Sequence, residues 1–172
     1  METVRDAATV MVVRDQPDLE VFVLRRNTAL EFAPGATVFP GGAVDPSDRT
    51  RAIDLGLDEF RVAAARECLE EAGIPLDPAD LIEIARWITP EGAPRRYDTR
   101  FFLARAPVGH DGEHDGSELI ASAWVRPVDA IAAYARGEIE LILPTLRSLE
   151  MLAMFDTVDA LFTRIEEQSC PT

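Results

Sequence analysis

The sequence predicts an α/β fold in which helices cover both faces of a mixed β-sheet. Apolar, β-branched segments alternate along the chain with segments of helical composition, in the order strands, helix, strands, helices. The chain has 172 residues, of which 47% are hydrophobic and 28% are charged, as is typical of a globular protein. A chain of this length can bury a sizeable core, and we therefore expect residues 1–172 to form a single domain.

The first third of the chain predicts strands that are joined by turns. Pro17 lies in the polar segment between the first two strands and indicates a turn. Pro40, Gly41 and Gly42 stop the third strand. After them, residues 43–57 predict an inserted loop or a short helical turn. The three predicted strands cover residues 9–13, 19–24 and 36–39.

Residues 58–72 give the clearest helical signal in the chain. This segment is rich in Ala, Arg, Glu and Leu, and it opens with acidic residues, which suit the start of a helix. Gly73 and Pro75 follow it and predict its end. We therefore expect one well-formed helix between two groups of strands.

The second half of the chain alternates again between strands and helices. The polar segment 110–117 is rich in Gly and Asp and predicts a loop. Gly137 ends the first predicted helix, and the second has a predicted break near Asp156. Strands are predicted at residues 81–87, 99–104 and 122–125, and helices at residues 128–136 and 144–166.

The charge and the cysteine content exclude several classes of function. Acidic residues number 31 against 17 basic ones, and the net charge of −14 argues against a nucleic acid or an anionic membrane surface as partner. A small phosphate ligand is still compatible, because a few arginines or a metal can reverse the field locally. Cys68 and Cys170 show no metal-type spacing, and no apolar run is long enough to span a bilayer. We expect a cytoplasmic location, since the N-terminus carries acids where a signal peptide needs a basic start.

The segment RECLEEAG, residues 66–73, concentrates negative charge on one side of the predicted helix. Glu67, Glu70 and Glu71 cover an arc of roughly 100°, where like charges repel one another. A solvated acidic face is one interpretation of this pattern. The other is a site for Mg²⁺ or Mn²⁺, because a hard divalent cation takes oxygen ligands and would turn the repulsion into binding energy.

These residues resemble the Nudix box. RECLEEAGI matches its core of Arg-Glu-apolar-x-Glu-Glu-x-Gly-apolar, and the upstream FPGG resembles the glycines that precede that core. The loop between Gly42 and Asp58 is longer than in the standard box, and Asp58 stands where the box has a Glu. The resemblance implies a Nudix-type α/β/α sandwich with a mixed sheet. It also implies hydrolysis of a nucleoside diphosphate derivative, a small-molecule substrate.

Two further segments are similar to one branch of the family. VFVLRRNTALEFAPGATVFPGGAVD, residues 21–45, resembles a segment of Nudix enzymes that act on coenzyme A and its esters. WITPEGAPRRYDTRFFLA, residues 87–104, is similar to a segment of the branch with an enlarged Nudix loop, whose characterised members cleave acyl-CoA. Coenzyme A or an acyl-CoA is therefore the first expectation for the substrate.

The resemblance also implies roles for individual residues. The three glutamates of the box would hold Mg²⁺ or Mn²⁺, which would neutralise the diphosphate and lower the pKa of a bound water. Gly42 would approach the metal through its backbone, with Gly41 beside it, although both also fit an ordinary turn. Arg66 would pair with an acid, taken to be Asp58, and brace the loop against the helix.

Downstream residues are expected to complete the site. Glu118 is the first candidate for an extra ligand or a general base, and Glu113 is the second, with a solvated loop acid as the alternative for each. Arginines would bind the remaining substrate charges, such as the 3′-phosphate of coenzyme A, unless they are only surface residues. The expected substrate-binding arginines are Arg25, Arg26, Arg95, Arg96 and Arg100.

Other chemically notable side chains are expected to be structural. His110 and His114 lie in the polar loop and are expected to face solvent. Cys68 occupies the apolar position of the box and is expected in the core, as are Trp87 and Trp124, whose alternative role is to stack on a base.

Three alternatives remain open from the sequence. The substrate could instead be ADP-ribose, NADH or a nucleotide sugar, because the box serves the same chemistry in all of them. A non-catalytic module that senses a nucleotide is a second alternative, although such modules usually lose box carboxylates and all three are retained. The apolar segment LPTLRSLEMLAMFDTVDALF, residues 143–162, would suit pairing with another subunit, which leaves a homodimer open.

Overall fold

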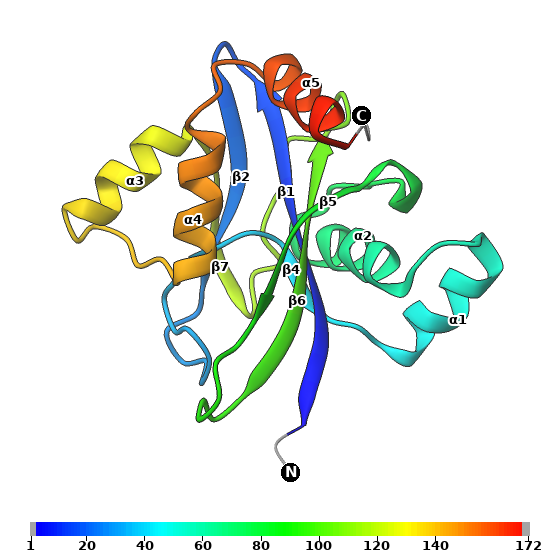
Figure 1. Ribbon diagram of the computed structural model, residues 1–172. Coiled ribbons are helices and arrows are strands. Elements are labelled where there is room, and N and C mark those ends of the chain that lie inside the picture. The colour runs from blue at the N-terminus through cyan, green and yellow to red at the C-terminus, as the bar shows by residue number, and fades with distance from the viewer. Residues whose placement is uncertain (1–2, 170–172) are drawn as a thin grey trace.

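The computed structural model describes residues 3–169 and confirms the α/β expectation, with helices on both faces of one mixed sheet (Figure 1). The strands are β1 (Val4–Asp15), β2 (Leu19–Arg26), β3 (Thr37–Val38), β4 (Gly41–Ala43), β5 (Ile82–Ile88), β6 (Arg96–Arg105) and β7 (Leu119–Val125). The helices are α1 (Pro46–Leu55), α2 (Glu59–Ala72), α3 (Pro127–Ala135), α4 (Leu143–Leu152) and α5 (Val158–Ser169), with a 3₁₀ turn at Pro78–Asp80. None of these helices has the length and apolar character needed to cross a membrane.

Strand β1 is the centre of the sheet. The order is β3-β2-β1-β6-β5, while β4 also pairs with β1 and β7 also pairs with β2. The β1–β6 pair is parallel and runs from Val4 opposite Arg96 to Val13 opposite Arg105, whereas the other strand pairs are antiparallel. This central position brings segments from distant parts of the sequence to one strand.

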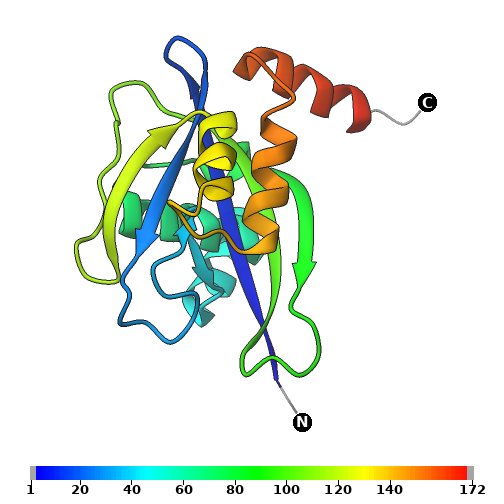
Figure 2. The same ribbon diagram turned by 90° about the vertical axis from the view of Figure 1, so that its left-hand side faces the viewer.

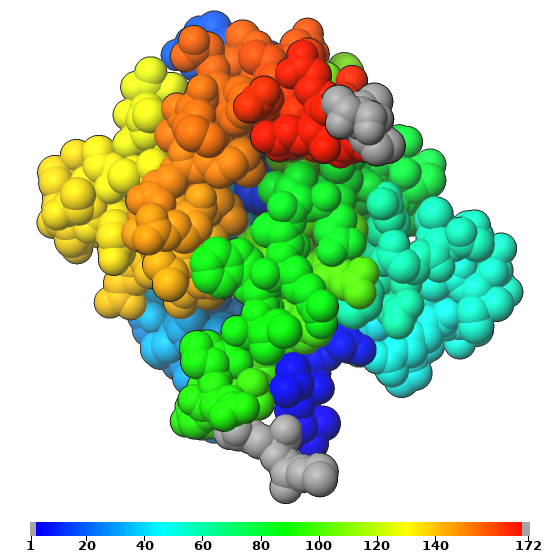
Figure 3. All heavy atoms as spheres, in the orientation of Figure 1, coloured from blue at the N-terminus to red at the C-terminus, as the bar shows by residue number. Residues whose placement is uncertain are grey.

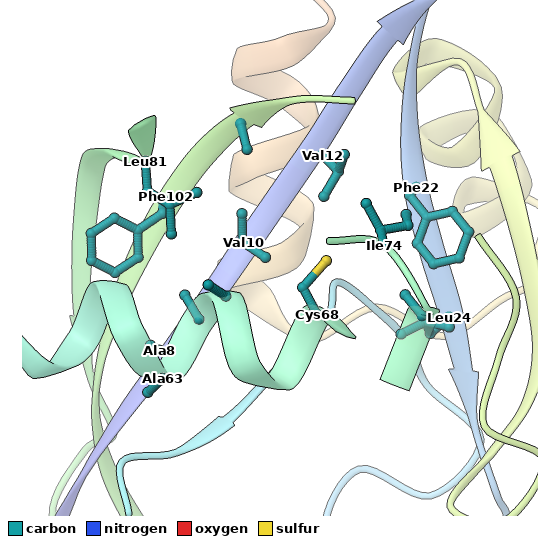
Figure 4. Close-up of a cluster of buried hydrophobic side chains, with 14 of the residues drawn as sticks. Ala8, Val10, Val12, Phe22, Leu24, Ala63, Cys68, Ile74, Leu81 and Phe102 are labelled. Atoms are coloured by element: carbon teal, nitrogen blue, oxygen red, sulfur yellow. The ribbon is translucent and has the colours of Figure 1, made fainter. Parts of the chain in front are cut away.

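The alternation of side chains along β1 supplies two separate hydrophobic cores. Val10 and Val12 face α2, where Figure 4 shows them near Cys68 of that helix. Met11 and Val13 point to the opposite face, which α3, α4 and α5 cover. Figure 2 shows α3 and α4 side by side over that face. Both cores are fully excluded from water around β1, so the sheet is a rigid support for the site.

Helix α2 begins and ends as its sequence predicts. The Asp58 side chain caps its start by accepting a hydrogen bond from the Arg61 backbone N–H at 3.0 Å. Gly73 ends it with a left-handed backbone, at a φ of 65°. Small buried residues, including Ala63 and Ala64, let the helix lie close to β1.

Two expectations about local structure change, and a third is confirmed. The segment expected to be an inserted loop or short turn contains the ten-residue helix α1, which Pro46 starts and Gly56 ends. The glycines expected only to stop a strand form β4, because Gly41–Ala43 pairs with β1. The predicted C-terminal helix divides into α4 and α5 around Asp156, so this break is confirmed.

The apolar C-terminal segment is largely used within the chain. Leu149 and Leu152 of α4 and Leu161 of α5 are fully buried in the core on that face of the sheet. Leu143 and Met154 remain exposed. Most of the hydrophobicity that suggested an interface therefore packs against the chain's own sheet.

Candidate active site

The three glutamates of α2 lie along one side of the helix, next to β4. Glu71 Oε2 accepts a hydrogen bond of 2.9 Å from the Gly41 backbone N–H. The Glu67 side chain is 15% exposed and the Glu70 side chain is 58% exposed, so the acidic face runs from the protein interior out to solvent. This gradient separates the carboxylates by environment although they share one helix face.

The two glycines of β4 make this close approach sterically feasible. A Cβ at Gly42 would lie 2.4 Å from Glu67 Oε1, which no side chain tolerates without displacing the carboxylate. A Cβ at Gly41 would lie 2.5 Å from the carbonyl oxygen of Ala8 on β1. The pairing of β4 with β1, in which Ala8 lies opposite Gly42, holds the glycines in place.

Arg66 ties the acidic face to the inserted helix. Its Nε and Nη2 donate to the two carboxylate oxygens of Asp48, each at 2.9 Å, which is the bidentate geometry of a strong ion pair. Its Nη1 donates to Glu67 Oε1 at 2.9 Å and to Glu70 Oε2 at 3.0 Å. The hydrogen bond with Asp48, followed by the nearby Glu67, raises the pKa of the Arg66 guanidinium.

The expected pair between Arg66 and Asp58 is wrong. Asp58 instead caps α2 and binds Arg61, with 2.9 Å between its Oδ2 and the guanidinium Nε. Asp48, which the sequence reasoning missed, lies in the first turn of α1 and is only 2% exposed. Counting forward from the glycines rather than back from Arg66 would have found it, because the extra residues follow Asp48 instead of preceding it.

Burial changes the acidity of the two inner glutamates. Removal from water raises the pKa of the Glu71 carboxyl to about 8, although the Gly41 hydrogen bond acts in the opposite direction. Burial also raises the pKa of Glu67, an effect that neighbouring Arg66 opposes. These two groups therefore hold negative charge at a cost, which a bound cation would relieve.

The donors on this face fit a hard divalent cation, which prefers carboxylate oxygens. Between residues 3 and 169, no three acidic, histidine or cysteine side chains already converge as a metal site. Instead of a cation, the Arg66 Nη1 pairs with both Glu67 and Glu70. A cation would have to compete with Arg66 for Glu70, whose exposed side chain is free to turn.

On the downstream loop, Asp115 is an acid whose charge acts on Glu71. Its charge contributes to the raised pKa of Glu71, and its Oδ1 accepts hydrogen bonds from the backbone of that loop. Glu113 and Glu118 are exposed, and neither side chain makes an ion pair or hydrogen bond within the described chain. Their expected roles remain predictions.

The five predicted arginines do not form one cluster. Arg26 acts on Glu71, whose pKa its charge lowers. Arg25 is exposed and lines a mainly apolar cavity of about 400 Å³ under α3, on the face of the sheet away from α2. Arg100 stacks on Phe60, 4.1 Å from the ring centroid, and has a structural contact there. Arg95 and Arg96 lie in the β5–β6 connection and the start of β6.

The residues expected to be structural lie largely where predicted. Cys68 is fully buried and His110 is exposed. His114 is half-buried, with its Nδ1 3.3 Å from the Ser122 hydroxyl, so full solvent exposure is wrong for it. Trp87 and Trp124 both pack against the cores and are half-buried.

Comparison with known proteins places the chain in a family. The NUDIX domain model matches residues 4–146. Putative nudix hydrolase 7 of Caenorhabditis elegans is 26% identical, over 97% of this chain and 67% of that protein. Acyl-coenzyme A diphosphatase NUDT19 of Gallus gallus is 24% identical, over 91% of this chain and 70% of that protein. The crystal structure of a NUDIX hydrolase from Alicyclobacillus acidocaldarius has a TM-score of 0.84 at 30% identity, covering 95% of this chain and 97% of that one.

Proposed function

The chain belongs to the NUDIX family of hydrolases, and on that premise we propose how it cleaves diphosphate-containing substrates and which substrate it prefers. The observation that carries the proposal is the contact of the α2 glutamates with β4. Glu67 lies against Gly42, and Glu71 accepts the Gly41 N–H. Few structural roles require two carboxylates to be buried so close to one another and to a glycine backbone.

We assign the metal site to Glu67, Glu70 and Glu71, with the backbone of Gly42 beside them. Bound Mg²⁺ or Mn²⁺ would neutralise the diphosphate and make a bound water more acidic. The Gly41 N–H binds one oxygen of Glu71, and the other oxygen would be available to the metal. Arg66 positions Glu67 and Glu70, and Asp48 in turn positions Arg66.

In the reaction, a water oxygen forms a bond to one phosphorus while that phosphorus loses its bond to the bridging oxygen. The second phosphate leaves with that oxygen, and the water proton passes to a carboxylate. Glu118 remains the proposed acceptor, with Glu113 as its rival.

Coenzyme A or an acyl-CoA is the proposed substrate. The support is the likeness of residues 21–45 and 87–104 to enzymes of that branch, together with the relative named as an acyl-coenzyme A diphosphatase. We also propose that residues 1–172 act as one catalytic domain. A homodimer through residues 143–162 stays a prediction, which sedimentation or light scattering of the purified chain would test.

A panel of diphosphates would test the function. Coenzyme A, an acyl-CoA, ADP-ribose, NADH and a nucleotide sugar would each be incubated with Mg²⁺ or with Mn²⁺, and products would be separated by chromatography. We expect the highest kcat/KM for coenzyme A or its ester. Better cleavage of ADP-ribose would overturn the substrate while leaving the chemistry intact. Nucleotide binding without hydrolysis of any member would instead support a sensing module.

A further inference from the structure

A second pocket lies at the start of β1, beside the connection between β5 and β6. It has a volume of about 320 Å³. Figure 3 shows the start of β1, in blue, against this green hairpin at the edge of the molecule. The pocket is lined by Thr3, Arg5, Pro94, Arg95, Arg96 and Tyr97. Half of its lining residues are therefore arginines, in a chain whose net charge is −14.

The charge of these arginines is only partly neutralised. Arg95 pairs with Glu31. Arg96 uses its Nε to donate to the Thr89 carbonyl oxygen at 3.1 Å, while Arg5 has no ion pair within residues 3–169. Asp6 follows Arg5 on β1 but pairs with Arg49. Asp98 follows Arg96 on β6 but pairs with Arg86. The remaining positive charge is therefore available to an anion.

A chain of contacts connects this pocket to Arg26, the arginine whose charge acts on Glu71. The charge of Arg26 acts on Glu71, and the Arg26 Nε donates to the Phe32 carbonyl oxygen at 3.1 Å. The Phe32 ring then meets the Tyr97 ring of the pocket edge to face, with 5.8 Å between centroids. The loop that contains Phe32 therefore contacts both Arg26 and the basic pocket.

The register of β1 indicates how far the basic pocket lies from the glutamates. Ala8 lies opposite Gly42, the glycine in contact with Glu67. Arg5 precedes Ala8 by three residues, which corresponds to about 10 Å along a strand. The odd separation turns the Arg5 side chain to the face of the sheet opposite that of Ala8, so one extended substrate with its diphosphate at the glutamates would reach the arginines round the edge of the sheet.

We propose that this pocket binds a phosphomonoester that the substrate carries in addition to its diphosphate. The inference rests on the proposed diphosphate site. Guanidinium groups match a terminal phosphate, because its oxygens accept paired N–H donors. Arg5, which the sequence reasoning did not select, is the central donor, and Arg96 is the second. Arg25 and Arg100 have no part in this pocket, because one lines the α3 cavity and the other stacks on Phe60.

The test compares coenzyme A with dephospho-coenzyme A, which lacks only the phosphomonoester. We expect Arg5→Gln to lower kcat/KM for coenzyme A roughly tenfold to hundredfold, as the loss of a charge-assisted hydrogen bond would. The loss should fall on KM, because the pocket is remote from the reacting phosphorus. Dephospho-coenzyme A should be cleaved equally well by Arg5→Gln and by the unmodified protein. Arg147→Gln, an exposed arginine paired with Glu150 on α4, is the matched control.

Two outcomes would overturn the inference without touching the diphosphate chemistry. One is an equal loss on both substrates in Arg5→Gln, and the other is equal efficiency of the unmodified protein on both. If neither substrate is hydrolysed, the proposed substrate fails and the pocket is still tested by calorimetry. Adenosine 3′,5′-bisphosphate should then bind more tightly than AMP, and Arg5→Gln should remove the difference. Equal binding of these two probes would show that the pocket does not recognise a phosphomonoester.

Discussion

Two acidic side chains at opposite ends of the same site differ in how the fold satisfies them. Asp48 is buried, but Arg66 contacts both of its oxygens and the Asp45 N–H donates to one of them at 2.8 Å. Glu71 is half-buried and, within residues 3–169, its carboxylate accepts a single hydrogen bond, from Gly41. A fully paired carboxylate is part of the structure, whereas an under-paired one is poised for a ligand. This contrast indicates that Asp48 stabilises the structure of the site, whereas Glu71 is suited to bind a ligand.

The largest effect should come from removing the paired acid. Asp48→Ala leaves Arg66 partly buried without its bidentate partner, and we expect the free energy of unfolding to fall by about 3 kcal/mol or more. Urea denaturation of the metal-free protein would measure this loss. Asp54→Ala on the same helix is the control, because Asp54 is exposed and its side chain makes no ion pair or hydrogen bond within residues 3–169. Equal, small losses in both variants would refute a bracing role for Asp48.

Removing an acid from the ligand end should affect turnover rather than folding. Glu70→Gln should lower kcat about a hundredfold or more, equivalent to about 2.7 kcal/mol in the activation free energy. The free energy of unfolding should change by less than about 1 kcal/mol, because the Glu70–Arg66 pair is exposed on the Glu70 side. Near-normal turnover at saturating metal would contradict the assignment of this face. Glu150→Gln on α4 provides the comparison.

The sequence predicted the ligand end of this site better than the braced end. The glutamates and their helix follow from a local pattern of 3.6-residue periodicity, so Glu67, Glu70 and Glu71 could be placed on one face without the fold. The partner of Arg66 could not be placed, because helix α1 brings Asp48 to it across the insertion. Local spacing favoured Asp58, whose side chain instead caps the start of α2.

Strand and helix types were also largely predictable, while short strands and loop positions were not. Each long apolar segment formed a strand, although β1 begins at Val4, five residues before its predicted start. Strand β4 was missed because glycines carry no strand preference of their own, and only pairing with β1 makes Gly41–Ala43 extended. Asp115 was missed because the loop backbone, rather than any motif, sets its position relative to Glu71.

The under-paired acid should give the metal-free protein a distinctive pH dependence. The folded-state pKa of Glu71, about 8, lies above its ordinary value of 4.5, so the folded protein binds the additional proton between these values. This stabilising contribution is complete below about pH 4.5 and is lost as the pH rises through about 8. Urea midpoints should therefore decline over this range, and Glu71→Gln should decline less. Parallel curves for both proteins would show that Glu71 titrates normally.

The smallest effect concerns the acid that does not pair with Arg66. Asp58→Ala should cost about 1 kcal/mol through loss of the helix cap. In a double-mutant cycle, its effect should add to that of Arg66→Gln, because the two side chains share no contact. Asp48→Ala and Arg66→Gln should instead be strongly non-additive. Coupling between Asp58 and Arg66 would restore the pairing that the sequence suggested.

The parallel pairing of β1 with β6 has a consequence for folding during synthesis on the ribosome. Strand partners such as Val4 and Arg96 are synthesised far apart in time, because ninety-one residues lie between them in the chain. During synthesis, β1 can form a hairpin with β2, but one edge stays unpaired until β6 leaves the ribosome. Such non-local pairing slows folding and exposes strand edges to association. The glycines against β1 and the α2 glutamates are synthesised before β6, so the proposed metal ligands are present in the chain well before the sheet can close.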